Sequence, residues 1–383
     1  METTALLTEL VAIDSTNSTL DPHGAGEGAM ATRLADLLDG LGFAVSVEEV
    51  APGRPNVLGV RHGDPSMPTL LFEAHLDTVP APPGGIPVRR EGDRLFGRGS
   101  CDCKGALAAM LCALEQLVSD GAPLPTVLLA GVADEETAMT GSAALLTALP
   151  PVAGAVIGEP TSLLPVRAHH GVVRVAMAAH GRAAHAATAH LGVNAILAAA
   201  RALDALDRDV VRPLAAKDHA LTGPATLTPS VIRGGIAPNV VPDACEVILD
   251  RRTAPGTTSA AALAEIDSVL ESVRRAGDDV RLGAPFVALP SVETPADDPI
   301  VIAAERAASH ALGRPVLAGG VAFATDACHL VGSGGIPSVV LGPGSIEQAH
   351  TADEWVDLRE VETAVAIYAG IVREFARTLP TGR

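Results

Sequence analysis

Acidic and imidazole side chains stand at the carboxyl ends of segments whose apolar pattern predicts strands. These are His75 and Asp77 after the run 69–74, Asp134, Glu135 and Glu136 after 127–133, Glu159 after 153–157, and His350 after 337–341. Open α/β sheets bind ligands beyond the carboxyl ends of their strands, so we expect these side chains to converge in one crevice. Asp102, on the loop before a helical pattern, can join them. Such a set of two imidazoles and several carboxylates suits two divalent ions such as zinc, with a shared carboxylate and an open position.

Each of these groups also has an ordinary structural interpretation. Glu135 and Glu136 alone are typical of a solvated acidic turn, and Asp102 alone is typical of a helix N-cap. His75 differs because Asp77 lies two residues on, where an extended segment places it on the same side, able to hold the imidazole tautomer. The joint placement at strand ends favours the metal-site hypothesis.

The elements that would position these residues follow two patterns. Apolar residues at helical spacing predict two opening helices, the second ending before Gly42, and further helices over 106–117 and 300–311. Their alternation with strand-like runs is typical of an α/β layer with a mainly parallel central sheet. Between 172 and 282 the order is β-α-β-β-α-β, which suits a ferredoxin-like α+β unit with an edge strand available for pairing.

Length and charge narrow the classes of partner. The 383 residues exceed what one hydrophobic core usually supports, so two domains are expected. The formal net charge of −18 opposes binding to nucleic acid or to an anionic membrane, and an aromatic share of 2% leaves little for base stacking. Nucleic acid and an anionic membrane are therefore not expected as partners.

Cysteine usage and the start of the chain predict the compartment. Five cysteines are too few and too irregular for a disulfide framework, which favours the reducing cytoplasm. Cys101 and Cys103 lack a second cysteine pair that would complete a thiolate metal site. The first residues, METTALLTEL, carry no export signal, and no apolar stretch of ~18 residues predicts a membrane span.

Five motifs, in order along the chain, resemble the M20 metallopeptidase family of dinuclear zinc hydrolases. They are AHLDTVP, GRGSCDCKG, ADEET, IGEPT and GPGSIEQAH. Within the family they resemble the acetylornithine deacetylase and succinyl-diaminopimelate desuccinylase branch. HGRAAHAATAHLGVNAI and APNVVPDACEVILDRR are similar to the family's lid and dimerisation domain. The resemblance thus implies a discontinuous catalytic domain of residues 1–171 and 286–383, with a lid and dimerisation domain of residues 172–285 inserted in it.

The resemblance implies a complete set of metal ligands. Asp102 would bridge two ions, His75 and Glu159 would complete the ligands of one, and Glu136 and His350 those of the other. The expected cofactors are two divalent ions, Zn²⁺ first and Co²⁺ as an alternative.

The resemblance also implies roles for five further residues. Glu135 matches the general base, and Asp77 matches the partner of the histidine ligand. His185 matches a lid histidine that, in dimeric members, reaches the other subunit's active site to steady the oxyanion. Asn239 and Arg252 match lid positions that contact the carboxylate side of the substrate. A homodimer through the inserted domain is therefore expected.

Together these residues predict hydrolysis of an N-acyl amino acid, with N-acetylornithine as the first expected substrate. A divalent ion lowers the pKa of bound water to ~7, and Glu135 could take the proton and pass it to the leaving amine. The alternatives are a succinyl-diaminopimelate desuccinylase, an aminoacylase, a dipeptidase, or a non-catalytic amino-acid-binding protein on the same fold. Cys103 and the run Thr188–His190 depart from the family pattern, and neither is expected to touch a metal ligand.

Overall fold

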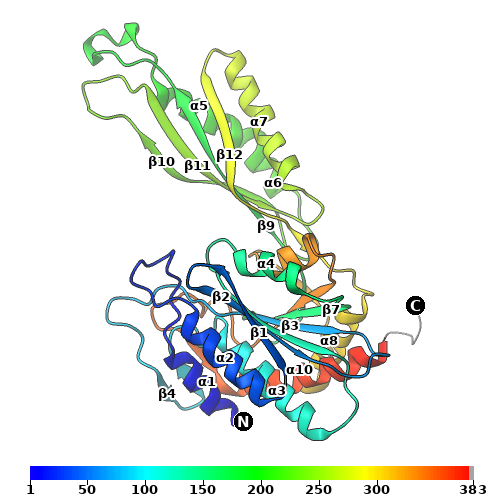
Figure 1. Ribbon diagram of the computed structural model, residues 1–383. Helices are drawn as coiled ribbons and strands as arrows, with labels where there is room; N and C mark the ends of the chain where they lie inside the picture. The colour runs from blue at the N-terminus through cyan, green and yellow to red at the C-terminus, as the bar shows by residue number, and fades with distance from the viewer. Residues whose placement is uncertain (379–383) are drawn as a thin grey trace. The chain divides into compact units, whose positions relative to one another are not determined.

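The computed structural model describes residues 1–378, which form two compact units (Figure 1). Unit 1 comprises Met1–Arg167, Thr294–Gly319 and the chain from Thr325 on, and unit 2 comprises Ala168–Glu293 and Gly320–Ala324. Unit 1 is therefore discontinuous in sequence. The range expected for the insert, 172–285, falls inside unit 2.

The core of unit 1 is a sheet whose central strands are parallel. The neighbours β6 (Val127–Val132), β3 (Leu70–His75), β7 (Gly154–Ile157) and β15 (Ser338–Val340) pair in parallel. Antiparallel pairing adds β2 (Arg54–Arg61) and β1 (Ala44–Ala51) beside β6, and β8 (Val166–His169) beside β15. The short strands β13 (Val292–Glu293) and β14 (Gly319–Val321) both pair with β8. The four central strands are buried along their whole length, as their mostly apolar sequences require; Glu73 of β3 is a buried exception. The predicted α/β class with a mainly parallel sheet is confirmed.

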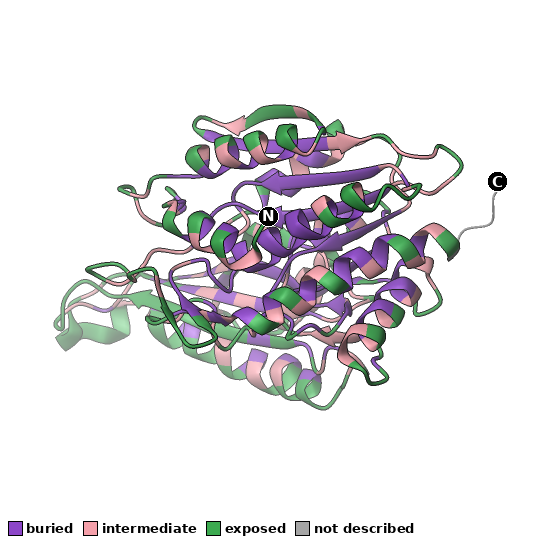
Figure 2. Ribbon diagram, turned by 90° about the horizontal axis from the view of Figure 1, so that it is seen from below, coloured by how far each residue is buried: buried purple, intermediate pink, exposed green. Residues whose placement is uncertain are grey.

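Helices cover both faces of this sheet. Those of the main core cluster are α1 (Thr3–Ala12), α2 (Gly28–Gly40), α3 (Lys104–Asp120), α8 (Pro299–Leu312) and α10 (Leu358–Thr378). Two short helices, α4 (Thr140–Ala148) and α9 (Ala327–Gly332), contact each other, and Figure 1 shows α4 across the sheet from α3 and α10. The purple central strands of Figure 2 show how completely these layers bury the sheet. No helix of residues 1–378 is long and apolar enough to cross a membrane.

Three parts of unit 1 were not predicted. The hairpin β1–β2 was missed because β1 is a largely exposed edge strand in which only Val45 and Val47 alternate with polar residues. Helix α10 was missed although its buried residues recur at helical spacing. A small sheet of β4 (Arg89–Glu91), β5 (Arg94–Phe96) and β16 (Trp355–Asp357) was also not predicted; it pairs segments more than two hundred residues apart and has β5 at its centre.

Unit 2 is a four-stranded antiparallel sheet with helices on one face. Its elements follow the predicted β-α-β-β-α-β order as β9 (Gly171–His180), α5 (Ala195–Leu206), β10 (Thr226–Gly234), β11 (Ala244–Thr253), α7 (Ser259–Arg275) and β12 (Asp279–Leu289). The spatial order is β10-β11-β9-β12, which leaves β10 and β12 at the edges. The connection between α5 and β10 holds a π-helical turn (Asp207–Val211) and α6 (Arg212–Ala215), and η1 (Ala186–Leu191) precedes α5. The ferredoxin-like arrangement is confirmed.

Alternation along the strands decides which face of this sheet the helices cover. Val175 and Met177 of β9 and Val247 and Leu249 of β11 are buried in one cluster with α5 and α7. Side chains one residue along, such as Arg174 and Asp250, lie on the opposite face. Among the described residues no helix of unit 2 belongs to that face, so its polar side chains stay partly exposed.

Candidate metal centre

Three neighbouring parallel strands bring four of the predicted residues to one edge of the sheet in unit 1. His75 ends β3, Glu135 and Glu136 follow β6, and Glu159 follows β7. Because β3 pairs in parallel with both β6 and β7, the three carboxyl ends lie side by side. His75, Glu135 and Glu159 place one ligand atom each within 4.8 Å of the others.

Asp102 lies between the two histidines and completes the cluster. Its Oδ1 is 3.0 Å from Nε2 of His75, and its Oδ2 is 3.2 Å from Nε2 of His350. The same nitrogen of His350 is 3.0 Å from Oε2 of Glu136, and Nε2 of His75 is 3.9 Å from Oε1 of Glu159. One carboxylate oxygen toward each imidazole, with a further carboxylate beside each, is the arrangement that a bridging ligand between two cations requires.

The electrostatics of the cluster fit two divalent ions. Burial and the repulsion of neighbouring carboxylates raise the pKa of Glu135 and of Glu159 well above the usual range. Burial also opposes ionisation of Asp102, but its hydrogen bonds with His350 and His75 outweigh this and hold its pKa below the usual range. Hydrogen bonds with Asp102 and Glu136 raise the pKa of His350 to about 10. Carboxylates crowded in this way, beside imidazole nitrogens, form a donor set whose negative charge zinc-like cations would neutralise.

Asp77 orients both sides of the cluster. The nearest partner of Nδ1 of His75 is the main-chain oxygen of Asp77 at 2.9 Å, whereas the carboxylate Oδ1 lies 3.8 Å away. That carboxylate accepts hydrogen bonds from the backbone N–H groups of Glu135 and Glu136 at 3.1 and 3.2 Å, and from Nδ2 of Asn17 at 2.7 Å. Asp77 therefore fixes the tautomer of His75 through its carbonyl and the glutamate loop through its side chain.

Glu354 is an organising residue that sequence reasoning missed. Its buried carboxylate accepts hydrogen bonds from the backbone N–H groups of Gly99, Cys101 and Asp102 at 2.9–3.0 Å, and from Nη1 of Arg98 at 2.6 Å. These bonds shape the loop that carries Asp102. In the sequence Glu354 resembles any surface acid, and only the pairing of β16 with β5 brings it here.

A second missed network supports the glutamate loop. Arg54 pairs with the fully buried Glu27 and, at 2.6 Å, with Oδ1 of Asp134, the residue before Glu135. Asp134 has a left-handed backbone conformation, φ 71°, and also accepts hydrogen bonds from Thr140 and Asn17. The turn that presents Glu135 is thus held from several directions.

The loop before α3 excludes the alternative that Asp102 is an ordinary N-cap: that position belongs to Cys103, and the carboxylate of Asp102 is turned to the histidines. The expectation that Cys103 touches no metal ligand was wrong, because its Sγ lies 3.4 Å from the carbonyl oxygen of His75. All five cysteines are free and buried.

The three residues predicted in the insert lie in unit 2, and the structure brings only two of them together. His185 and Asn239 are exposed on neighbouring loops, joined by a hydrogen bond from the N–H of Ala186 to the carbonyl of Asn239 at 2.9 Å. Arg252 lies eight residues after Ala244, the residue at which β11 begins, a rise of roughly 25 Å at ~3.3 Å per residue. Arg252 is therefore at the other end of the strand from His185.

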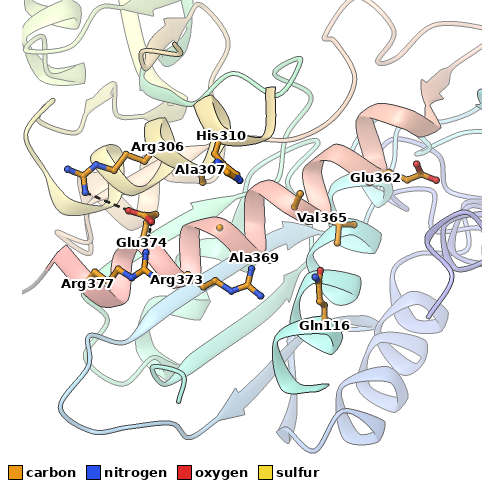
Figure 3. A pocket seen from close by; sticks show the side chains of 12 residues that line it. Gln116, Arg306, Ala307, His310, Glu362, Val365, Ala369, Arg373, Glu374 and Arg377 are labelled. Atoms are coloured by element: carbon orange, nitrogen blue, oxygen red, sulfur yellow. Dashed lines mark hydrogen bonds and ion pairs between the residues drawn. The ribbon is translucent and has the colours of Figure 1, made fainter. Parts of the chain in front are cut away.

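A cavity of about 710 Å³ on unit 1 shares no lining residue with the candidate metal centre. It lies between α3, α8 and α10 (Figure 3). Its arginines are neutralised locally, since Arg306 and Arg377 lie 3.6 and 2.9 Å from Glu374, and Arg373 lies 2.6 Å from Asp120. We assign no chemistry to it.

The fold and the site together are those of a hydrolase family. Residues 71–374 match Peptidase family M20/M25/M40, and the chain belongs to this family. It is 31% identical to acetylornithine deacetylase of Proteus mirabilis over 97% of this chain and 96% of that protein. The family resemblance inferred from the motifs is confirmed.

Solved structures show the same architecture. Aminopeptidase PepT from Bacillus cereus superposes with a TM-score of 0.83 at 23% identity, over 98% of each chain. The YXEP protein of Bacillus subtilis, described as a dinuclear metal-binding peptidase of the M20 family, superposes with a TM-score of 0.74 at 18% identity, over 98% of this chain and 96% of that one.

Proposed function

We propose that the protein hydrolyses the amide bond of N-acyl amino acids, N-acetylornithine first among them, with two divalent ions at the candidate metal centre. The observation that carries this proposal is Asp102 between His75 and His350, one carboxylate oxygen toward each, with Glu135 close by. Similarity to a deacetylase along nearly the whole chain supports the reaction class.

Five residues would hold the ions: Asp102 between them, His75 and Glu159 on one side, and Glu136 and His350 on the other. Bound there, zinc or cobalt would supply Lewis acidity toward water and the substrate carbonyl. His350 is the most open of the ligands, with 49% of its side chain exposed, which leaves substrate a side of approach.

Glu135 is the proposed general base and acid. It is not needed as a ligand, its backbone is held by Asp77, and desolvation raises the pKa of its carboxyl above the usual range. A carboxylate with a raised pKa is a stronger base, which can take a proton from the attacking water and return it to the nitrogen of the leaving amine.

We assign His185 and Asn239 to the active site of a second copy. Within one subunit they lie roughly 25 Å along β11 from Arg252, and an N-acyl amino acid is far shorter than this. An imidazole N–H donor delivered by a partner would stabilise the oxyanion, an effect typically worth ~2.7–4 kcal/mol per donor.

The surface beside His185 suits that dimer. Apolar side chains there are unusually exposed, with Ile236 at 87%, Leu191 at 58% and Leu197 at 54%. The nearby edge strand β10 adds Ile232 at 57% and an unpaired row of backbone groups. We therefore propose a homodimer through unit 2. Its place in the cytoplasm is proposed from the five free cysteines.

A substrate panel tests the proposed reaction. The zinc- or cobalt-loaded protein is assayed for amine release from N-acetylornithine, other N-acetyl and N-formyl amino acids, N-succinyl-diaminopimelate and dipeptides. We expect the highest kcat/KM for N-acetylornithine, since a chain of net charge −18 offers a field that favours a cationic side chain. A preference for the succinyl substrate or for dipeptides would contradict the proposed substrate but would still be consistent with an amide hydrolase. No turnover of any amide would support the amino-acid-binding alternative.

A further inference from the structure

The helix-free face of the unit 2 sheet carries two arginines held by one carboxylate. Nε of Arg174 lies 2.9 Å from Oδ2 of Asp250, and Nε of Arg252 lies 2.7 Å from Oδ1 of the same side chain. We infer that Arg174, Asp250 and Arg252 form a two-guanidinium clamp for the α-carboxylate of the substrate, with Arg174 as a further substrate-binding residue. This inference rests on the proposed function, because it assumes a substrate with a free carboxylate.

Strand register places the three side chains together. Arg174 of β9 is the direct cross-strand partner of Asp250 of β11, and Arg252 is the partner of Val172, two residues before Arg174. Residues two apart share a face, so both guanidiniums lie on the side of the sheet opposite α5 and α7.

Arg251 shows what a purely structural arginine looks like in this strand. It lies on the helix side with 2% of its side chain exposed, donates to the carbonyls of Thr226 and Arg252, and pairs with Glu265 of α7. Arg174 and Arg252 differ in both respects: their side chains are 40% and 30% exposed, and among residues 1–378 each forms its ion pair only with Asp250.

The donor geometry leaves both arginines able to bind a ligand. Each arginine donates its Nε–H to Asp250, so the two Nη amino groups of each guanidinium remain as donors for a ligand. Asp250, with 18% of its side chain exposed, thereby sets the orientation of both. Planar guanidiniums fixed in this way recognise a carboxylate through paired hydrogen bonds, which an ammonium cannot reproduce.

The charge count selects the ligand. Two guanidiniums and one carboxylate leave one net positive charge, which a single carboxylate balances. An N-acyl amino acid with a free α-carboxylate fits, whereas its carboxamide offers no charge and a second carboxylate has no counter-charge in the clamp. Asp250 therefore acts as a positioning residue that also keeps the clamp selective for one carboxylate.

Kinetics with paired substrates test Arg174 separately from the proposed reaction. The metal-loaded full chain is assayed with N-acetyl-L-ornithine and with its α-carboxamide. We expect the wild type to hydrolyse the acid with a higher kcat/KM than the carboxamide. Arg174→Ala should raise KM for the acid about 10-fold or more, and should change little both kcat for the acid and kcat/KM for the carboxamide. Arg174→Lys should recover only part of the loss. The control is Arg281→Ala: this arginine of β12 is paired with its own Asp279 and should leave both substrates unaffected.

A change of charge in the clamp gives a second test. Asp250→Asn changes the net charge of the three-residue clamp from +1 to +2. The ratio of kcat/KM for the dianion N-acetyl-L-glutamate to kcat/KM for N-acetylornithine should therefore rise severalfold. The clamp is overturned if Arg174→Ala, folded as judged by circular dichroism, discriminates acid from carboxamide as well as the wild type does. A wild type that hydrolyses both substrates without preferring the acid would also overturn the clamp, whereas a wild type that hydrolyses neither would overturn the proposed function.

Discussion

The candidate metal centre of unit 1 and the polar face of unit 2 differ in how far their charged side chains are buried and in how many partners hold each of them. In unit 1 most charged groups of the cluster are buried and held by several partners: Asp77, for instance, accepts three hydrogen bonds, and Glu354 accepts four. In unit 2 Arg174, Arg252 and His185 are partly or fully exposed, each with few partners. Charges that must act on a reacting bond gain strength from burial and cannot rearrange, whereas charges that recognise a ligand must stay accessible until it arrives. The following predictions test this difference.

The largest effect is expected at the buried base. Chelation should abolish turnover, and zinc or cobalt should restore it. Glu135→Gln should bind metal normally yet lose about 10³-fold or more in kcat, because it removes the proton acceptor and leaves the ligands in place. Metal content by mass spectrometry and steady-state kinetics check this. Full activity in metal-stripped wild type would show that the candidate metal centre does not take part in the reaction.

A large effect is also expected at the exposed loop. Glu135→Gln and His185→Ala subunits should each be nearly inactive alone. Mixed dimers isolated after co-expression with two affinity tags should recover about half of wild-type activity per site, since one of the two sites in each mixed dimer has an intact base and an intact partner histidine. His190→Ala, on the same loop, is the matched control and should remain active by itself. Verified mixed dimers without recovery would place His185 in its own subunit's site or in none.

A smaller effect is expected where a carboxylate supports a ligand indirectly. Glu354→Gln replaces one acceptor oxygen by an amide donor facing N–H groups, so the Asp102 loop should lose its shape. We expect metal affinity to fall about 10–100-fold, with kcat largely restored at saturating metal. Titration with zinc in a competing chelator measures this. Glu347→Gln, an exposed glutamate near His350, should not change the affinity.

The last expected effect concerns the stability of the fold and not its chemistry. His169 is buried, its Nδ1 lies 2.8 Å from the carbonyl oxygen of His170, and burial lowers its pKa to about 4. Because the unfolded state, with a pKa near 6.5, binds the proton first, this residue should cost stability as pH falls from about 7 to about 4, on the order of 3 kcal/mol at most. His169→Gln should flatten that part of the pH dependence of urea unfolding. His190→Gln, exposed in the same unit, should leave it unchanged.

Sequence reasoning predicted that the acids and histidines at the strand ends converge, because a local pattern and one general rule suffice there. An apolar run followed by an acid or a histidine marks each strand end, and parallel pairing then brings His75, Glu136 and Glu159 to one edge. The β-α-β-β-α-β order of unit 2 followed in the same way from periodicity along the chain.

The residues that escaped prediction depend on pairings that no local pattern specifies. Glu354 acts through the β5–β16 pairing, and Arg174 through the register of β9 with β11. A shift of one residue in either register would turn the side chain to the other face. Helix α10 is different, because its apolar periodicity is present in the sequence and was overlooked.

The loop that carries Asp102 receives its shape from a part of the chain that is synthesised much later. Cys101 and the glutamate that fixes it are 253 residues apart, so about two-thirds of the polypeptide must leave the ribosome between the two. The histidine at position 350 comes equally late. A nascent chain that has already made β3, β6 and β7 therefore still lacks His350 and the glutamate that shapes the Asp102 loop. On the proposed ligand set, a chain terminated before residue 350 would lack one ligand of the second ion.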